Sequence, residues 1–349
     1  MIPHSKVVLD EGDLASVTRV FRSGLLTQGK YVSVLEEKAA SFIGVNHAVA
    51  VSSGTAALHL SLLCLGIGEG CEVIIPSYVC TALLNAVNYV RATAVLVDID
   101  PATYNITIEG IKEAITKKTK AIIVPHMFGL PADIEPIVSL GIPVIEDCAH
   151  SVGAKFRGRY TGSFGLLSVF SFYATKMLGA GEGGMVLSND RDLIETVRDL
   201  REYDEKTTYA VRYNYKLTDI QAALCESLLK KIPSFIEKRR EIAGLYDNGL
   251  RDVGAKFPVV PGGREHVYYR YVVPLEDPLP FVEEMGKRGV ECRRPVFKPL
   301  HKYLQLPGYP MTDNAWEKAV SIPIYPSLKR EEVCLIVDAM KTIHESSSN

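Results

Sequence analysis

The chain has 349 residues, and its 39 basic side chains nearly balance 41 acidic ones, for a formal net charge of −2. This length is enough for about two domains, and the balanced charge makes nucleic acid or an anionic membrane surface an unexpected main partner. The seven cysteines show no Cys-x-x-Cys spacing. This argues against both a disulfide framework and a structural zinc site, so no metal is expected.

Residues 1–26 contain no long apolar run, because Asp10, Glu11 and Asp13 interrupt the segment early. A signal peptide or a membrane span requires such a run. We therefore expect a cytoplasmic protein.

The first elements in chain order are two amphipathic helices, predicted over Gly12–Arg22 and Val32–Phe42. Each is followed by a glycine, Gly24 or Gly44, which suits the left-handed backbone that commonly ends a helix. The polar turn Leu26–Gly29 lies between them and could serve as a binding loop.

Between residues 48 and 188, short β-rich runs alternate with longer segments of helical period. This alternation indicates a mainly parallel sheet covered by helices. Several runs are apolar without alternation, as expected of strands that are buried on both faces. The seven predicted strands are Ala48–Val51, Glu72–Pro76, Ala94–Asp98, Ala121–Pro125, Pro143–Glu146, Leu167–Phe172 and Gly184–Ser188.

After the sheet region the sequence is mostly helical and charged over residues 190–250, and Asp219–Lys231 has the apolar spacing of a helix that could link two lobes. The remaining residues mix short strands, such as Tyr268–Val273, with helices and proline-rich loops. This mixture predicts a smaller α+β lobe. We therefore expect a large domain over residues 1–245 and a small C-terminal domain over residues 246–349.

The most informative run follows the sixth predicted strand, where Lys176 comes just after an apolar segment and just before the glycine-rich turn Gly179–Gly184. A lysine that leaves a buried strand loses its proton easily and can then form a Schiff base with a carbonyl cofactor. Taken alone, Lys176 would more simply be a solvated surface lysine. Other parts of the chain decide between the two interpretations.

A candidate anion site follows the first predicted strand. Ser52–Leu58 opens a helix, and its small residues bring backbone N–H groups to the helix N-terminus. Such a terminus binds anions, although an ordinary helix cap by Ser53 or Thr55 gives the same pattern. An anion site combined with Lys176 predicts that the ligand is a phosphate-bearing aldehyde.

Two carboxylates and a histidine follow the fifth predicted strand, in Glu146–His150. Ligand sites in open parallel sheets lie at the carboxyl ends of the strands, where Asp147 could pair with a protonated ring nitrogen of the cofactor. His150 is suited to hydrogen bond to Asp147 or to a cofactor oxygen. The alternative is a helix-capping aspartate and a buried core histidine. The functional interpretation is favoured for Asp147, and both stay open for His150.

Three further residues lie where they could join this site. Tyr78, at the end of the second predicted strand, could stack on a planar ring or simply pack in the core. Ser171 lies on the strand that precedes Lys176 and could donate its hydroxyl hydrogen to a phosphate. Asn214 is distant in sequence and would reach the site only through folding or from a second subunit.

In their order along the chain, these motifs resemble the DegT/DnrJ/StrS family of aminotransferases, pyridoxal-phosphate enzymes that aminate nucleotide-linked ketosugars. The resemblance implies the type I α/β fold of such enzymes, as in aspartate aminotransferase, with a seven-stranded, mostly parallel sheet in the large domain and a smaller C-terminal α+β domain. It extends from Ile2-Pro3 to Ser321–Pro326. The segments that carry it are Ser53–Leu58, Asp98–Pro101, Glu146–Gly153, Phe170–Lys176, Gly181–Gly184, Tyr213–Tyr215 and Gln221–Ala223.

The resemblance also implies how the cofactor, pyridoxal 5'-phosphate, is held at its ring. Lys176 would bind it covalently as a Schiff base, and Asp147 would meet the pyridine nitrogen. Tyr78 would stack on the ring in the place of the aromatic residue of the family. His150 matches a position that the family fills with His or Gln.

The same resemblance assigns residues to the cofactor phosphate. Gly54, Thr55 and Ser171 would hold it within one subunit. Asn214 would reach the phosphate of the neighbouring subunit, since family members are homodimers with shared active sites.

The implied reaction is a transamination in two halves. An amino donor, expected to be L-glutamate, passes its amino group to the cofactor and leaves as 2-oxoglutarate, while Lys176 acts as general base and then general acid. A nucleotide-diphospho-ketosugar then takes the amino group from pyridoxamine phosphate, so that ping-pong kinetics is expected. The product would be an amino sugar for surface polysaccharide or antibiotic biosynthesis.

The chain departs from the family pattern in Gly289–His301, where sugar contacts are expected. The basic residues Arg293, Arg294 and Lys298 could serve a diphosphate or belong to a solvated loop, and the loop is slightly favoured. His301 is a candidate substrate contact.

Two other functions remain as alternatives. Some relatives are cofactor-dependent sugar dehydratases that carry histidine in place of the lysine, so Lys176 argues against that activity. Other relatives were named as regulators, but a non-catalytic regulatory protein has no need of an imine-forming lysine.

Overall fold

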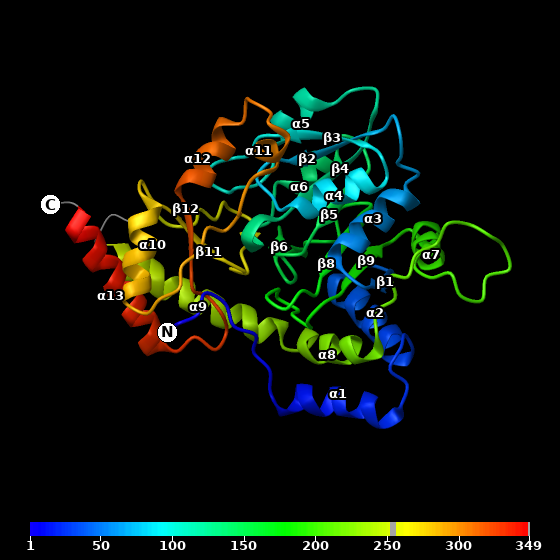
Figure 1. Ribbon diagram of the computed structural model, residues 1–349, viewed down its shortest axis with the longest axis horizontal. Helices are drawn as coiled ribbons and strands as arrows, with labels where there is room; N and C mark the ends of the chain where they lie inside the picture. Colours follow the sequence, from blue (N-terminus) through cyan, green and yellow to red (C-terminus); the bar gives the residue numbers. More distant parts are fainter. Residues whose placement is uncertain (252–255, 348–349) are drawn as a thin grey trace.

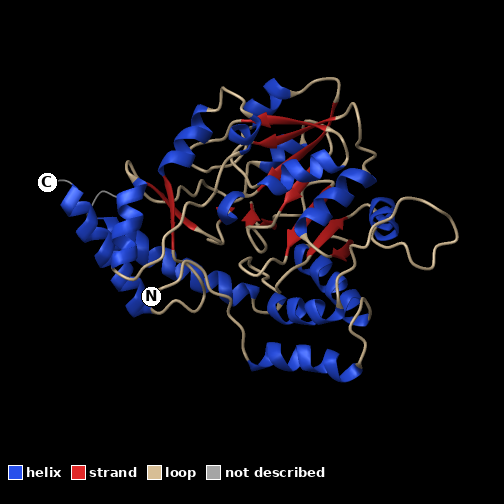
Figure 2. Ribbon diagram, viewed as in Figure 1, coloured by secondary structure: helices blue, strands red, loops and turns tan. Residues whose placement is uncertain are grey.

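The computed structural model describes residues 1–251 and 256–347. Most of the chain forms a central sheet with helices on both of its faces, and a smaller group of helices and strands stands beside it (Figures 1 and 2). Residues 252–255 and 348–349, which fall in the predicted small domain, lie outside the described part of the chain.

The central sheet has seven strands in the order β1-β9-β8-β5-β4-β2-β3. Strand β9 runs antiparallel to both of its neighbours, and the other pairs in this sheet are parallel. The prediction of a seven-stranded, mostly parallel sheet is confirmed. The strands are β1 (His47–Val51), β2 (Glu72–Pro76), β3 (Thr93–Val97), β4 (Thr119–Pro125), β5 (Val144–Asp147), β8 (Leu167–Ser171) and β9 (Gly184–Ser188).

Apolar residues fill both faces of this sheet, which is why its strands show little alternation in sequence. Along β1, Val49 and Val51 pack into one buried cluster, whereas Ala48 and Ala50 pack into the cluster on the opposite face. Helices α3 (Gly54–Cys64), α4 (Thr81–Tyr89) and α7 (Arg191–Leu200) contribute to the first cluster. Helices α2 (Lys30–Ile43), α5 (Ile108–Ala114), α6 (Ile134–Val138) and α8 (Asp219–Leu229) cover the other face.

The N-terminal helices end as the sequence predicts. Helix α1 (Glu11–Ser23) is followed by Gly24 with φ 70°, and α2 is followed by Gly44 with φ 83°. The turn between them is tied to α8, because the carboxylate of Asp219 accepts hydrogen bonds from the N–H groups of Gly29 (2.9 Å) and Val32 (3.0 Å). These bonds give the Leu26–Gly29 turn a structural role.

A second hydrophobic core lies beside the sheet, under the last part of the chain. It collects residues of the long helix α9 (Ile232–Leu250), the hairpin of β11 (Tyr271–Pro274) with β12 (Ala319–Ile322), α10 (Pro278–Lys287) and α13 (Arg330–Ser347). Ile2, at the other end of the chain, packs into the same core and forms a bridge with Val290. The predicted boundary near residue 245 falls inside α9, and the domain limits stay a prediction.

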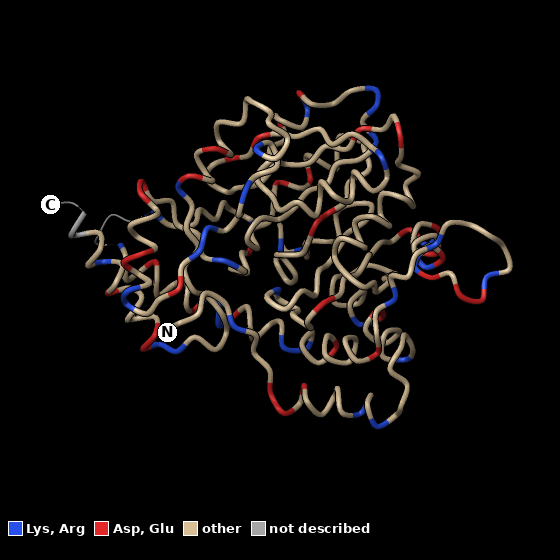
Figure 3. Tube along the Cα trace, viewed as in Figure 1, with Lys and Arg blue, Asp and Glu red and all other residues tan. Residues whose placement is uncertain are grey.

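The remaining elements are short and lie around these two cores. Basic and acidic residues alternate over the surface without separating into two faces (Figure 3). Within the residues that the structure describes, no helix is long and apolar enough to cross a membrane. The short elements are the 3-10 helix η1 (Met127–Gly129), β6 (Lys155–Phe156), β7 (Arg159–Tyr160), β10 (Arg264–Glu265), α11 (Leu300–Leu304) and α12 (Pro310–Lys318).

Candidate active site

The start of α3 lies beside the carboxyl end of β8 in the central sheet. Gly184 of β9 pairs with Ser171 on one side and with Val51 on the other, so the chain after β1 passes close to Ser171. A Cβ atom on Gly54 would lie 2.9 Å from the Cβ of Ser171. The sequence therefore needs glycine at position 54 for the loop to approach Ser171.

The same loop presents backbone donors beside Ser171. The hydroxyl of Ser53 caps α3 by accepting a hydrogen bond from the N–H of Ala56 (3.0 Å). The N–H groups of Gly54 and Thr55, in the first turn, have no acceptor inside the helix. These donors, the positive end of the helix dipole and the hydroxyl of Ser171 together suit a phosphate group.

Lys176 lies on the tight turn that follows β8. Backbone hydrogen bonds from Phe172 to Gly183 (2.8 Å) and from Ala174 to Gly181 (2.9 Å) close this turn, and Gly183 adopts φ 141°. The ammonium nitrogen of Lys176 stands 5.0 Å from the centre of the Tyr269 ring. Across the described residues, this nitrogen has no hydrogen bond and no ion pair. An amine held in this way is available to react.

Asp147 ends β5, the neighbour of β8, and is 8% exposed. Burial raises the pKa of its carboxyl group, and the nearby charge of Lys176 acts in the opposite direction. The carboxylate accepts a hydrogen bond from the N–H of Ala149 (3.0 Å), its one side-chain hydrogen bond within the described part of the chain. A buried carboxylate with unused acceptor capacity suits a cationic N–H group, such as a protonated pyridine nitrogen.

His150 is held between two aromatic rings rather than by Asp147. Its ring stacks on Tyr269 at 4.4 Å and lies parallel to Phe128 at 6.3 Å between centroids. Burial and the charges of Lys176 and Arg270 hold its pKa well below the ordinary value, so the ring is neutral. No hydrogen bond joins His150 to Asp147 among the described residues. One of the two contacts predicted for His150 is therefore absent, and the contact with a cofactor oxygen stays a prediction.

The structure contradicts the prediction that Tyr78 stacks on the cofactor ring. A stacking residue needs one open face, but Tyr78 is 0% exposed. Its ring packs against Tyr104 (5.7 Å), and its hydroxyl lies 3.4 Å from the carbonyl oxygen of Ala315. The core-packing alternative is correct. Cys80, two positions on, has an exposed surface and lies near both Lys176 and Asp147. Desolvation by the surrounding protein raises the pKa of its thiol, and the charge of Lys176 acts in the opposite direction.

His301 is buried, and both of its ring nitrogens contact protein groups. It is 1% exposed, and its ring nitrogens lie 2.7 Å from the hydroxyl oxygen of Ser77 and 3.0 Å from a carboxylate oxygen of Asp313. Its ring stacks on Tyr309 at 4.9 Å. With both nitrogens occupied, His301 fastens the C-terminal segment to the end of β2. The prediction of a direct substrate contact is wrong.

Asn214 is exposed at the base of a long loop. The segment between α7 and α8 projects away from the rest of the fold (Figure 1), and Tyr209 within it is 97% exposed. The loop is anchored at the edge of the sheet, where Lys216 forms a bridge with Val51 and the carbonyl of Tyr215 accepts a hydrogen bond from Ser52 (2.8 Å).

One buried cluster has residue types that bind metals, but its carboxylate is already saturated. His126, Glu146 and Cys148 lie close together. The carboxylate of Glu146 bonds to the ring of His126 (3.0 Å) and accepts hydrogen bonds from the N–H groups of Gly162 (2.8 Å) and Phe164 (2.7 Å). These bonds indicate a structural role, in which Glu146 fixes the loop before β8.

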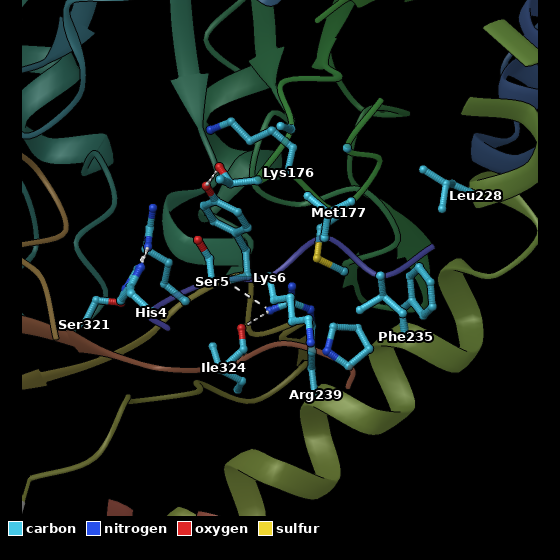
Figure 4. Close-up of a pocket in the computed structure, with 18 of the residues that line it drawn as sticks. His4, Ser5, Lys6, Lys176, Met177, Leu228, Phe235, Arg239, Ser321 and Ile324 are labelled. Atoms are coloured by element: carbon cyan, nitrogen blue, oxygen red, sulfur yellow. Dashed lines mark hydrogen bonds between the residues drawn. The ribbon is translucent and has the colours of Figure 1, made fainter. Parts of the chain in front are cut away.

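The sequence did not reveal the N-terminal and C-terminal residues that complete the site. A pocket beside Lys176 is lined by His4 and Lys6 from the N-terminal segment, together with Arg239 and Arg270 (Figure 4). His4 and Arg270 are in contact although 266 positions separate them. No local motif links such distant residues, so only the folded structure brings them together.

Comparisons with known proteins agree with this geometry. A model of the DegT/DnrJ/EryC1/StrS aminotransferase family matches residues 8–341. UDP-N-acetyl-3-dehydro-alpha-D-glucosamine 3-aminotransferase of Acidithiobacillus ferrooxidans is 34% identical, over 95% of this chain and 94% of its own. GDP-perosamine synthase of Escherichia coli O157:H7 is also 34% identical, over 91% of each protein. Among solved structures, the aminotransferase TlmJ from Streptoalloteichus hindustanus gives a TM-score of 0.95 at 32% identity and covers 100% of both chains.

Proposed function

The chain belongs to the DegT/DnrJ/EryC1/StrS aminotransferase family, and on this premise we propose that it moves an amino group from L-glutamate to a nucleotide-linked ketosugar. The observation that supports this most strongly is the meeting of Lys176, Asp147 and Ser171 at the carboxyl ends of neighbouring strands. Ligands of open α/β sheets bind at such ends.

Enzymes of this family use pyridoxal 5'-phosphate, and the residues of this site fit that group. When bound, the cofactor supplies an electron sink for the charge that remains on carbon after a proton is removed. Asp147 would hold the proton of the ring nitrogen, and the N–H groups of Gly54 and Thr55 would bind the phosphate together with the hydroxyl of Ser171. Cys80, rather than Tyr78, would face the cofactor.

Lys176 would perform the proton transfers. Its amine has no hydrogen bond or ion pair in the described structure, and a lysine released from a carbonyl can remove a proton from the donor carbon and return it elsewhere. The neutral ring of His150 would cover the site without adding another positive charge beside Lys176.

The activities for which two relatives are named support the acceptor class. Two relatives at 34% identity are named for amination of a UDP-linked sugar and for synthesis of GDP-perosamine. We therefore propose a nucleotide-diphospho-ketosugar as acceptor and an amino sugar as product.

We also propose that the active form is a homodimer in which Asn214 completes the site of the partner subunit. The exposed position of Asn214 beside a projecting loop supports this, because a residue at such a place can reach a second copy.

The experiment that tests the function uses the purified protein loaded with pyridoxal phosphate. L-glutamate is supplied with a panel of UDP-, GDP- and dTDP-linked ketosugars, and the formation of 2-oxoglutarate and of aminated nucleotide is measured. We expect 2-oxoglutarate to form catalytically with at least one acceptor. Failure of glutamate to convert the bound cofactor, seen as an unchanged absorption spectrum, would contradict the proposal.

A further inference from the structure

A pocket of about 580 Å³ opens between the N-terminal segment, residues 4–8, and the turn that carries Lys176 (Figure 4). Helix α9 and strand β12 supply its other walls, through Arg239 and Ser321.

The charged residues that line this pocket are basic. The lining contains the basic residues Lys6, Lys176, Arg239 and Arg270, and among the described residues no aspartate or glutamate lines it. Arg239 is buried and donates hydrogen bonds to three backbone carbonyl oxygens, but its Nε atom has no partner in the described structure. Burial lowers its pKa only to about 10, so it remains charged at neutral pH.

Arg270 is the basic residue best placed to receive an anion. Its guanidinium carbon and the ammonium nitrogen of Lys176 each lie 5.0 Å from the centre of the same ring, that of Tyr269. In the described part of the chain, no carboxylate lies within 4.0 Å of Arg270. A guanidinium that has no carboxylate partner and contacts the same aromatic ring as the Lys176 amine can bind a carboxylate through two parallel hydrogen bonds.

His4 holds this guanidinium in place without neutralising it. Nη1 of Arg270 lies 2.9–3.0 Å from the ring nitrogens of His4, and Nε2 of His4 is 2.9 Å from the hydroxyl of Ser321. Burial, together with the charge of Arg270, lowers the pKa of His4 to about 3, so its ring is neutral and can accept a hydrogen bond. The carboxylate of Glu291 accepts hydrogen bonds from the backbone N–H of His4 (3.0 Å) and from the guanidinium of Arg293 (2.8 Å).

We propose that this pocket binds a carboxylate of the amino donor, with Arg270 as its anchor and His4 as a positioning residue, so that the enzyme selects a dicarboxylate donor. The inference rests on the proposed function, because it concerns the donor of that same reaction.

The test is a binding titration that does not depend on turnover. Holoenzyme is titrated calorimetrically with maleate, a dicarboxylate without an amino group, in wild-type, Arg270→Gln and Arg157→Gln forms. Arg157 is an exposed arginine paired with Glu135 (2.6 Å) and serves as the control for net charge. We expect Arg270→Gln to weaken maleate binding at least about tenfold, and Arg157→Gln to leave it unchanged.

Kinetics should show the same selectivity. Arg270→Gln should raise KM for L-glutamate by a similar factor and leave KM for the ketosugar unchanged. His4→Leu should weaken maleate binding, and His4→Gln, which keeps an acceptor for Arg270, should restore most of it. Equal maleate affinity in wild type and Arg270→Gln would overturn the inference.

Further measurements distinguish a carboxylate site from a diphosphate site and separate this inference from the proposed function. If Arg270→Gln weakens binding of UDP but not of maleate, the pocket serves a diphosphate and the inference is wrong. If Arg270→Gln does not fold, Arg270→Lys replaces it, because lysine keeps the positive charge but lacks the paired N–H donors of arginine. We expect Arg270→Lys to bind maleate several-fold more weakly than wild type. Unchanged maleate binding would contradict the inference. Wild type that binds maleate but fails to react with glutamate would refute the proposed function instead.

Discussion

The reactive residue of this protein owes its properties to its surroundings. Lys176 sits on a tight turn, its amine has no bonded partner in the described structure, and its charge acts on Asp147, His150 and Tyr269. Burial alone would raise the pKa of Tyr269, but the positive charges of Lys176 and Arg270 lower it to about 8. The site thus places positive charge near the buried carboxylate of Asp147.

Replacement of that carboxylate should separate catalysis from folding. Burial raises the pKa of Asp147, so its ionised form opposes folding at pH values above the unfolded pKa. Asp147→Asn apoprotein should therefore have a free energy of unfolding at pH 7 no lower than wild type. Activity should fall on the order of 100-fold or more, because the amide cannot favour a protonated ring nitrogen.

The two quantities are measured by urea unfolding of the apoprotein and by initial rates of the holoenzyme. Asp192→Asn, which changes an exposed carboxylate in the first turn of α7, is the control and should alter neither. Full activity in Asp147→Asn would refute the role assigned to Asp147.

At the residue scale, sequence placed Lys176, Asp147, Ser171 and Gly54 together because strand ends and a helix N-terminus have local patterns. It misplaced Tyr78, since a residue at a strand end can point either into the core or toward the site. The packing of Tyr104 and Phe128 against Tyr78 decides this, and these contacts join segments with no shared sequence pattern.

At the scale of elements, the sheet was predictable and the connection to the C-terminal segment was not. Apolar runs at regular spacing located all seven strands, because burial on both faces demands them. The contact of α11 and α12 with the end of β2 depends on His301, Ser77 and Asp313. His301 and Asp313 are 12 positions apart, but Ser77 is 224 positions from His301. The sequence shows His301 only as a polar residue in a segment that departs from the family pattern, and it does not show the contact with Ser77.

The contacts of His301 with Ser77 and Asp313 predict that its replacement lowers the stability of the protein. His301→Ala should lower the free energy of unfolding by about 3 kcal/mol, because it opens a cavity and leaves the buried hydroxyl of Ser77 with a lost partner. Lys302→Ala is the matched control: it pairs with the same carboxylate of Asp313 (2.7 Å) but is partly exposed, so its cost should stay below about 1 kcal/mol.

Chemical unfolding of both variants measures these costs, and steady-state kinetics with the ketosugar measures their effect on substrate binding. If His301→Ala instead kept its stability and raised KM for the ketosugar, His301 would be a substrate contact after all.

At the scale of the whole molecule, both ends of the chain and a projecting loop matter to the site. The N-terminal segment crosses to the C-terminal lobe, where Ile2 pairs with Val290 and His4 meets Arg270. The loop before α8 leaves the fold with Tyr209 and Val211 exposed. Sequence patterns report local structure, so neither arrangement could be read from them.

A mixing experiment tests whether the site is shared between two subunits. Lys176→Ala and Asn214→Ala proteins should each be nearly inactive as pure dimers. After subunit exchange, activity should recover to about a quarter of wild type, because half of the dimers are mixed and each has one intact site of two. Recovery is measured as 2-oxoglutarate formed per protomer. Absence of recovery, with exchange verified by native mass spectrometry, would place Asn214 in its own subunit's site or outside the site.

The central claim is that Lys176 holds the cofactor. Holoenzyme is treated with sodium borohydride, which fixes a lysine-bound pyridoxal phosphate, and its peptides are then analysed by mass spectrometry. We predict the added cofactor mass on the peptide that contains Lys176, and no addition in Lys176→Ala protein. Labelling of another lysine, such as Lys6 in the adjoining pocket, or equal labelling of Lys176→Ala protein, would contradict the account.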